Sequence, residues 1–158
     1  ASSLDTVMSI GTGVAINFAT EFFHPPTPVN VPVRGFGHGQ RLRIVGIPVS
    51  HGHQRFQVNL HTPQDNAFHF NPRFDEVAVV RNSTSYGSWQ QEERFADSFP
   101  FEYGKIFTLE FVAQPGVIQV YHNGRLFSEF AERHAPFAIN RIEVDGDIHV
   151  HSIHVSSN

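Results

Sequence analysis

Polar side chains suited to binding a neutral sugar are concentrated between His69 and Arg94. The run His69-Phe70-Asn71-Pro72-Arg73 supplies an imidazole, an amide and a guanidinium at alternate positions. Successive side chains of a β-strand point to opposite faces, so a strand here would expose this polar row and bury the neighbouring phenylalanine rings. The stretch that follows adds further candidates for the same surface: Asn82, Trp89, Glu92 and Arg94.

These residue types match what sugar hydroxyls require, because each hydroxyl both donates and accepts hydrogen bonds. Arginine offers only donors, glutamate only acceptors, asparagine both, and histidine either according to its tautomer. Glu92 is expected to bond both Arg73 and Arg94, which would fix the two guanidiniums and offset part of their charge. The alternative is a set of ordinary polar residues on an exposed sheet face, and residues 69–73 alone do not decide between the two.

Trp89 is the only tryptophan, and it lies in a polar stretch rich in glycine and serine. A ring in such a stretch is well placed to stack on the apolar face of a sugar, although core packing is the commoner role of a tryptophan. Trp89 is an odd number of residues from both Glu92 and Arg94. One regular strand through all three would therefore place the Trp89 side chain on the opposite face from the other two. We therefore place Trp89 in the loop before a strand over Gln91–Phe95.

A second run, Arg55–Leu60, alternates polar and apolar residues in the same way. Two such strands side by side would expose their polar rows on one surface. The polar members of this run are Arg55, Gln57 and Asn59. They are candidates for an extended subsite, and an ordinary solvated strand face is an equally favoured interpretation.

The whole chain is typical of an all-β protein. Short alternating or apolar runs recur at intervals of roughly 8–12 residues, and none has the length and period of an amphipathic helix. Without helices to connect parallel strands, the consistent architecture is two antiparallel sheets packed face to face. Asn123-Gly124 is typical of a tight type I′ hairpin turn. The predicted strands are Arg41–Val49, Arg55–His61, Ala67–Phe74, Val77–Asn82, Gln91–Phe95, Ile106–Ala113, Val117–His122, Arg125–Phe130, Ile139–Val144 and Asp147–Val155.

A chain of 158 residues with 16 phenylalanines is large enough to bury one substantial core. No second domain, internal repeat or low-complexity tract is evident. We divide the chain into an extension over residues 1–23 and one domain over residues 24–157. The extension either adds an edge strand around Val14–Phe18 or is partly mobile. Prolines at positions 25, 26, 28 and 32 favour an extended edge segment after it.

Charge and composition exclude several classes of function. The formal net charge is −4, Lys105 is the only lysine and no basic run occurs, which argues against a nucleic-acid partner. No segment is long and apolar enough to insert into a membrane. The absence of cysteine excludes disulfides and thiolate chemistry.

Two features of the sequence bear on location. It begins Ala1-Ser2-Ser3 without an intact signal peptide, which leaves a previously removed one open. Asn82-Ser83-Thr84 is a glycosylation sequon, and a glycan there would block a site that uses Asn82. We therefore expect a cytoplasmic protein that could also reach the extracellular space by non-classical secretion.

The 11 histidines raise the question of a metal site. His149 and His151 share a strand face, and His51 and His53 lie close together in a glycine-containing loop. Neither pair has an evident third ligand in the sequence. Solvent-facing histidines are therefore expected, with no metal and no cofactor.

The sequence resembles the galectins over roughly residues 24–157. The shared motifs are His69-Phe-Asn71-Pro-Arg73, Val80-Arg-Asn82, Trp89-Gln-Gln-Glu92-Glu-Arg94, Phe99-Pro100-Phe101 and Val144-Asp145-Gly146-Asp147. The short connection from Arg73 to Asn82 is closer to some invertebrate members. Galectins are lectins that bind β-galactosides without a metal, on a jelly-roll of two antiparallel sheets. The resemblance therefore implies a non-enzymatic lectin with a concanavalin-like jelly-roll, whose partners are glycans that carry β-galactosides.

The resemblance also implies a role for each candidate residue. The implied galactose contacts are His69, Asn71 and Arg73 at the axial 4-hydroxyl, Asn82 and Glu92 at the 6-hydroxyl, and Trp89 against the ring. Arg73, Glu92 and Arg94 would reach the second sugar. Arg81 occupies a position that is small and apolar in several relatives, so preferences beyond galactose stay open.

Two other functions stay open at this point, as does assembly. A glycoside hydrolase would need two carboxylates flanking the scissile bond, and Glu92 is the only one that the motif directs to the sugar. Glu93 has the opposite strand parity, and Asp75 and Glu76 lie in a turn beyond the motif. A galectin-like fold that has lost sugar binding would instead work through protein contacts. A homodimer, formed through a sheet edge or the extension, is equally open.

Overall fold

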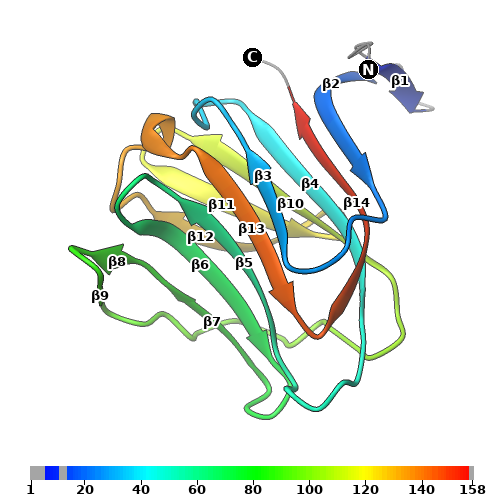
Figure 1. Cartoon of the computed structure of the whole chain (residues 1–158), viewed down its shortest axis with the longest axis vertical. Coiled ribbons are helices and arrows are strands. Elements are labelled where there is room, and N and C mark those ends of the chain that lie inside the picture. Colours follow the sequence, from blue (N-terminus) through cyan, green and yellow to red (C-terminus); the bar gives the residue numbers. More distant parts are fainter. Residues whose placement is uncertain (1–5, 11–13, 157–158) are drawn as a thin grey trace.

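The computed structural model describes residues 6–10 and 14–156 of the chain. Two sheets lie face to face, and the chain passes repeatedly from one to the other (Figure 1). Neighbouring strands pair antiparallel throughout the described residues of both sheets. The predicted all-β, jelly-roll sandwich is therefore confirmed.

The larger sheet has seven strands in the order β1-β2-β14-β4-β10-β11-β12, and the smaller has five in the order β3-β13-β5-β6-β7. Strands β8 and β9 form a short separate pair. The bounds are β1 Thr6–Ile10, β2 Val14–Phe23, β3 Val29–Pro32, β4 Arg41–Pro48, β5 Phe56–His61, β6 Asn66–Arg73, β7 Ala78–Asn82, β8 Thr84–Ser85, β9 Ser88–Trp89, β10 Phe107–Gln114, β11 Val117–His122, β12 Arg125–Ala131, β13 Arg141–Gly146 and β14 Ile148–Ser156, with a 3₁₀ turn η1 at Pro136–Ala138.

Nine of the ten predicted strands occur within about two residues of their expected ends, which is the usual uncertainty of strand boundaries. The predicted type I′ turn is also confirmed, because Asn123 and Gly124 both have positive φ, at 48° and 83°. Strands β1, β3, β8 and β9 were not individually predicted. The short strand β3 lies at the margin of its sheet, as the prolines of this segment indicate.

The predicted strand Gln91–Phe95 is wrong, and the cause is the side chain of Arg81. One antiparallel bridge joins Arg81 to Glu93. The next pair of a continued ladder would be Val79 and Phe95. Instead, the Arg81 guanidinium donates from Nη1 to the Val79 carbonyl at 2.9 Å and from Nη2 to the Phe95 carbonyl at 2.6 Å. The inserted side chain takes the acceptors of the ladder, so pairing stops after one bridge.

The extension contributes strands to the larger sheet. Strand β2 pairs with β14, with Phe23 opposite Ser152, and β1 pairs with β2 beyond it. The edge strand expected around Val14–Phe18 is thus the first half of a longer strand. The parts of the extension at residues 1–5 and 11–13 lie outside the described residues.

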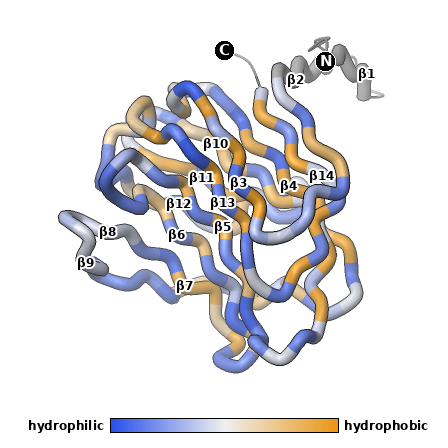
Figure 2. The backbone as a smooth tube through the Cα atoms, in the orientation of Figure 1, coloured by the Kyte–Doolittle hydropathy of each residue, from blue (hydrophilic) through white to orange (hydrophobic). Residues whose placement is uncertain are grey.

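The core fills the space between the two sheets and is rich in phenylalanine. Polar and apolar residues alternate along the strands (Figure 2), and β4 alternates half-buried with buried positions along its whole length. Phe68 on β6 is fully buried and stacks on Phe130 of β12, with ring centroids 4.4 Å apart and planes within 11°. Offset aromatic pairs of this kind add to the stabilisation from area burial.

Strand β6 departs from simple alternation, because its first seven residues are all buried. Ala67, Phe68 and Phe70 lie in the core, whereas His69 and Asn71 have only 8% and 4% of their surface exposed on the opposite face of the sheet. Polar side chains are rarely buried on an outer sheet face unless neighbouring groups satisfy them. The outer face of β6 is therefore the place to look for a site.

Replacement of Phe68 by alanine tests the dependence of this strand on the core. We expect Phe68→Ala to lower the free energy of unfolding by about 3–5 kcal/mol, because it removes a fully buried ring and leaves a cavity between the sheets. Urea denaturation followed by fluorescence measures the change. Phe137→Ala is the matched control, because Phe137 is 77% exposed and its loss should change the unfolding free energy little. Equal effects of the two replacements would contradict this assignment of the core.

Candidate functional site

A shallow groove of about 440 Å³ lies on the outer face of the five-stranded sheet, over β5, β6 and β7. The register of these strands places His69 beside Asn82 on one side and beside Asn59 on the other. Six of the seven residues predicted to bind sugar line the groove. The lining residues are Arg55, Gln57, His69, Asn71, Arg73, Val80, Asn82, Trp89, Gln90 and Glu92.

Trp89 forms one wall of the groove, although it lies in the short strand β9 rather than in a loop. Its side chain is among the exposed large apolar groups, with 56% of its surface accessible. The indole ring is 4.8 Å from the His69 ring, measured between centroids. An aromatic ring that is open to solvent beside buried polar groups can stack on the apolar face of a ligand.

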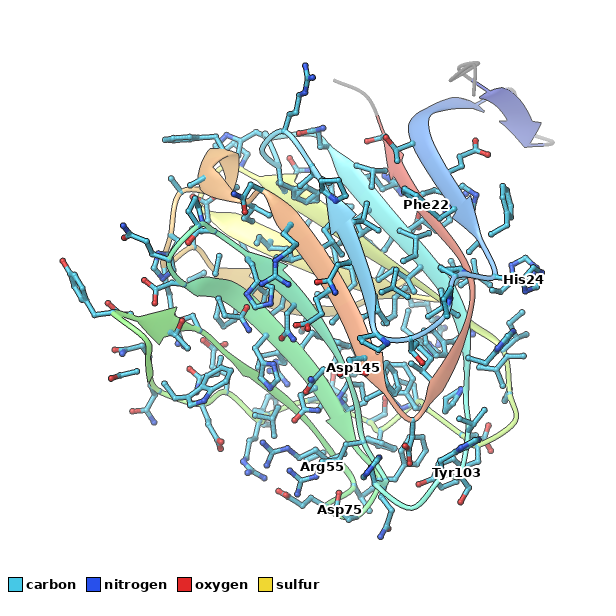
Figure 3. The ribbon with its side chains drawn as sticks, viewed as in Figure 1. Phe22, His24, Arg55, Asp75, Tyr103 and Asp145 are labelled. Carbon is cyan, nitrogen blue, oxygen red and sulfur yellow. The ribbon has the colours of Figure 1, made fainter. Side chains whose placement is uncertain are left out.

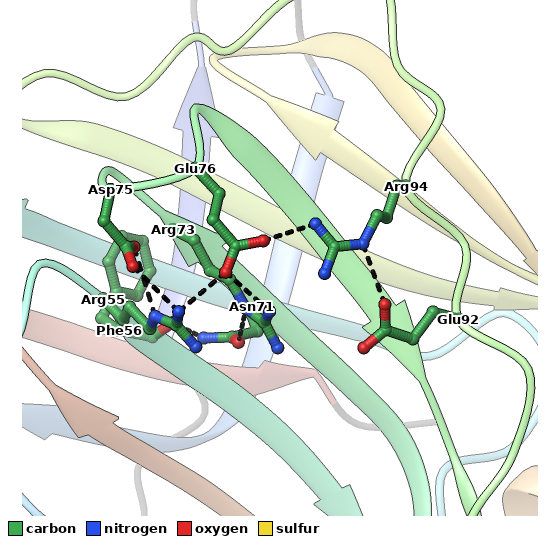
Figure 4. Close-up of polar contacts among 8 residues, drawn as sticks. All are labelled: Arg55, Phe56, Asn71, Arg73, Asp75, Glu76, Glu92 and Arg94. Atoms are coloured by element: carbon green, nitrogen blue, oxygen red, sulfur yellow. Dashed lines mark hydrogen bonds and ion pairs between the residues drawn. The ribbon is translucent and has the colours of Figure 1, made fainter.

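At one end of the groove, arginines and carboxylates alternate in a network centred on Glu76 (Figure 4). The carboxylate of Glu76 accepts from Arg55 Nη2 at 2.7 Å, from Arg73 Nη1 at 3.0 Å and from Arg94 Nη1. Asp75 accepts from Arg55 at 2.8 and 3.2 Å, and the pair lies at one end of the sandwich (Figure 3). Hydrogen bonds from Arg94 and then Arg73 hold the pKa of the Glu76 carboxyl below its ordinary value.

This network corrects the expected role of Glu92. Among residues 6–10 and 14–156, Glu92 accepts only from Arg94, at 2.8 Å, and the residue that joins Arg73 to Arg94 is Glu76. Glu76 lies in the turn between β6 and β7, beyond the sequence motif, and was not among the predicted site residues. The signal that could have found it is an acidic pair, Asp75-Glu76, in a short turn directly after Arg73. Arg94 itself does not line the groove but is held at its margin through these two carboxylates.

The three candidates for an extended subsite divide into two groups. Arg55 and Gln57 line the groove, beside Arg73 and Asn71. Asn59 does not line it, because its side chain is only 4% exposed and lies behind His69. The Nδ1 atom of His69 is 2.6 Å from Asn59 Oδ1. Asn59 is therefore a support of the site and not part of its surface.

His69 is kept neutral by its surroundings. Burial, followed by the nearby positive charge of Arg73, lowers the pKa of His69 from 6.5 to about 4. Asn71, its neighbour in the row, donates to the Phe56 carbonyl at 2.8 Å and accepts from Arg73 Nε at 2.8 Å. These contacts fix the direction of the amide and of the guanidinium before any ligand is present.

Asn82 is anchored by a residue that the sequence did not suggest. Arg133, which follows β12 in the other sheet, donates from Nη1 to Asn82 Oδ1 at 3.1 Å and from Nη2 to Glu93 at 2.9 Å. Asn82 in turn donates to the Gln90 carbonyl at 3.0 Å. The segment that carries Trp89 is thereby tied to both sheets.

The histidine pairs considered for metal binding serve other contacts. His53 Nδ1 is 3.1 Å from Asp147 Oδ1, and Asp147 also accepts from the backbone of residues 51, 53 and 54. The ring of His24 lies near those of His149 and His151. Among residues 6–10 and 14–156, no group of three histidine or acidic side chains is arranged to hold a metal ion.

No helix in these ranges has the length and apolar character needed to cross a membrane.

The lowered pKa of His69 has a measurable consequence for stability. Since the folded-state pKa lies below the ordinary value of 6.5, His69 contributes stability above pH 6.5 that is lost as pH falls towards about 4. We expect the free energy of unfolding of the wild type to fall more steeply across this interval than that of His69→Gln, by up to about 3 kcal/mol.

Urea denaturation between pH 7.5 and pH 4 measures this difference. Other titrating groups are shared by the two proteins and cancel in the comparison. His51→Gln is the control for the loss of one imidazole, because His51 is exposed and lies outside the groove. Parallel profiles for the wild type and His69→Gln would show that His69 is not held neutral.

The sequence of this chain is similar to those of known lectins. The family model described as galactoside-binding lectin matches residues 26–155. The 32 kDa beta-galactoside-binding lectin of Haemonchus contortus is 38% identical over 122 residues, which are 77% of this chain and 42% of that protein. Galectin-4 of Bos taurus is 39% identical over 137 residues, which are 83% of this chain and 41% of that protein.

A solved structure gives the same result. The crystal structure of Caenorhabditis elegans galectin LEC-6 matches with a TM-score of 0.83 and 52% identity, covering 87% of this chain and 96% of that one. The chain spans about two fifths of the length of the relatives named above. Because the family model covers most of the chain, and the fold and sequence both match a solved member, this chain belongs to the galectin family of galactoside-binding lectins.

Proposed function

We propose that this chain is a lectin that binds β-galactosides in the groove over β5, β6 and β7, without a metal and without catalysis. The observation that carries the proposal is that six of the side chains predicted from the sequence line one groove, and that one of them is the exposed indole ring of Trp89. Relatives in Haemonchus contortus and Caenorhabditis elegans are named as beta-galactoside-binding lectins, which supports the same class of ligand.

In this proposal, galactose lies with its apolar face on Trp89 and its axial 4-hydroxyl between His69 and Arg73. Arg73 supplies donors only, and the amide of Asn71 holds its guanidinium in place. An equatorial hydroxyl would leave these desolvated groups unpaired, at a cost of about 1–3 kcal/mol each, and this separates galactose from glucose. Asn82 and Glu92 line the part of the groove assigned to the 6-hydroxyl.

The second sugar of a disaccharide would lie over the network of Arg55, Arg73, Glu76 and Arg94. Together with Asp75 and Glu92, the network pairs three guanidiniums with three carboxylates, so the wall that they form is held by ion pairs and is close to neutral overall. A preformed wall reduces the ordering cost of binding. A shallow groove of this kind is expected to bind a disaccharide with a dissociation constant of about 10 μM to 1 mM.

The carboxylates near the groove favour binding over hydrolysis. A glycosidase needs one carboxylic acid that stays protonated to donate to the leaving group. Glu76 and Glu92 both accept hydrogen bonds from Arg94, and the pKa of Glu76 is lowered rather than raised. Neither is suited to act as a general acid, so we propose a non-enzymatic role. A fold that works only through protein contacts is the outcome to accept if no glycan binds.

A glycan array with titration calorimetry on lactose tests the proposal. We expect the chain to bind glycans with terminal β-galactose, and binding to persist in EDTA. Trp89→Ala and Arg73→Ala should each weaken lactose binding by about 10-fold or more, because they remove the stacking surface and the main donor. Tyr86→Ala is the matched control, since Tyr86 is 97% exposed in the same hairpin and does not line the groove. An array without β-galactoside signal, or unchanged binding in both variants, would remove the basis of the proposal.

Glu76 gives a separate test of the second-sugar wall. Glu76→Gln removes the carboxylate shared by Arg55, Arg73 and Arg94, so the wall loses its rigidity and gains positive charge. We expect lactose binding to weaken by about 10-fold and methyl β-galactoside binding to change by less than about 3-fold. Glu102→Gln is the control, because within residues 6–10 and 14–156 Glu102 forms an ion pair only with Lys105, on an exposed surface away from the groove. Equal losses for both sugars would place the effect of Glu76 at the galactose and not beyond it.

A further inference from the structure

The side-chain amide of Asn59 is held in one orientation behind the groove. Its Nδ2 atom is 2.9 Å from Glu143 Oε1, and its Oδ1 atom accepts from Asn66 Nδ2 at 2.9 Å. Burial acts to raise the pKa of Glu143, but hydrogen bonds from His61 and Asn59 lower it below its ordinary value. An ionised carboxylate has no hydrogen to donate, so the group of Asn59 that faces Glu143 must be the NH₂.

The orientation of Asn59 determines which nitrogen of His69 carries hydrogen. His69 Nδ1 is 2.6 Å from Asn59 Oδ1, and a carbonyl oxygen can only accept. Nδ1 must therefore be the donor. The ring is neutral at pH 7, because burial and the charge of Arg73 keep the pKa of His69 low. A neutral imidazole with its hydrogen on Nδ1 has a bare lone pair on Nε2.

We propose that Asn59 is a positioning residue that holds His69 in this tautomer, so that the groove offers an acceptor at His69 and selects a hydroxyl that donates to it. The support runs straight across the sheet, because Glu143 on β13 faces Asn59 on β5, which faces His69 on β6. The inference rests on the proposed function for the identity of the ligand. The tautomer itself is a property of the free protein.

The neighbours of His69 give this acceptor its selectivity. Arg73 lies on the same strand and can only donate, so an oxygen placed between the two must accept from one and donate to the other. A hydroxyl does both, whereas a fluorine or an ether oxygen does not. The other charged or titratable groups that act on the His69 ring are Glu92, from the loop after β9, and His61, from β5.

Nitrogen-15 NMR of the free protein, labelled at histidine, reads the tautomer directly. We expect His69 to show a protonated Nδ1 and an unprotonated Nε2 at pH 7. Asn59→Ala removes the acceptor, so the signals should move towards a mixture of tautomers and lactose affinity should fall by about 10-fold. Asn30→Ala is the control, because Asn30 is an exposed asparagine on the same sheet that contacts Arg141 and not His69.

A double replacement, Asn59→Asp with Glu143→Gln, keeps the hydrogen-bond pattern and moves its one negative charge from position 143 to position 59. The new carboxylate still accepts from His69 Nδ1, and the new amide can donate to it. We expect the Nδ1-protonated tautomer to be retained and lactose affinity to stay within about 3-fold of the wild type at pH 7. The titration midpoint of His69 should rise, because a negative charge now faces the ring. This variant carries the test if Asn59→Ala fails to fold.

The outcomes separate this inference from the proposed function. Wild-type protein with hydrogen on Nε2, or an Asn59→Ala variant with unchanged tautomer and affinity, overturns the role of Asn59 even if lactose binds. Absence of lactose binding by wild-type protein with the expected tautomer overturns the proposed ligand instead. If lactose binds, its 4′-deoxy-4′-fluoro analogue, in which the 4-hydroxyl of the galactose is replaced by a fluorine that cannot donate, should bind about 10-fold more weakly. Equal binding would show that no donation to His69 is required.

Discussion

The site depends on the burial of polar groups on the outer face of a strand. His69 and Asn71 are nearly inaccessible although they lie on the side of β6 that faces away from the core. Buried polar groups must find partners, and these partners fix the direction of each donor and acceptor. Asn59, Phe56 and Arg73 satisfy them within the protein. What remains for a ligand is a small set of preset hydrogen-bonding positions, so little order has to be gained on binding.

The sandwich supplies those partners from elements far apart in the chain. Glu143 on β13 supports His69 indirectly, because it accepts from Asn59 on β5. Arg133 donates to Asn82 from the end of β12 in the opposite sheet. The aromatic contacts between the sheets, such as Phe68 on Phe130, hold the two layers in register beneath the groove. A change in the packing of the two sheets would therefore change the orientation of the hydrogen-bond donors and acceptors in the groove, although these lie outside the core.

Much of this arrangement could be predicted from alternation along the chain. Parity placed Phe68 in the core and His69 on the outer face, and it brought the run at Arg55 beside the run at Arg73. Parity fails where one side chain replaces a backbone partner, as Arg81 does at the false strand Gln91–Phe95. It also cannot find Glu76, which acts from a turn, or separate Asn59, which supports the site, from Gln57, which lines it. These depend on hydrogen bonds between distant residues, which spacing does not encode.

The inserted guanidinium of Arg81 also bears on the solubility of the molecule. A strand at the margin of a sheet exposes backbone groups that can template pairing with another chain, and this is a common route to aggregation. At β7, the Val79 carbonyl is already occupied by a charged fork, and the adjacent polypeptide covers the margin without forming a ladder of its own. A foreign strand would have to expel a buried cation to dock there. The same arginine that ends the ladder thus leaves another chain no free acceptor at Val79, while the open face beside it stays accessible to small ligands.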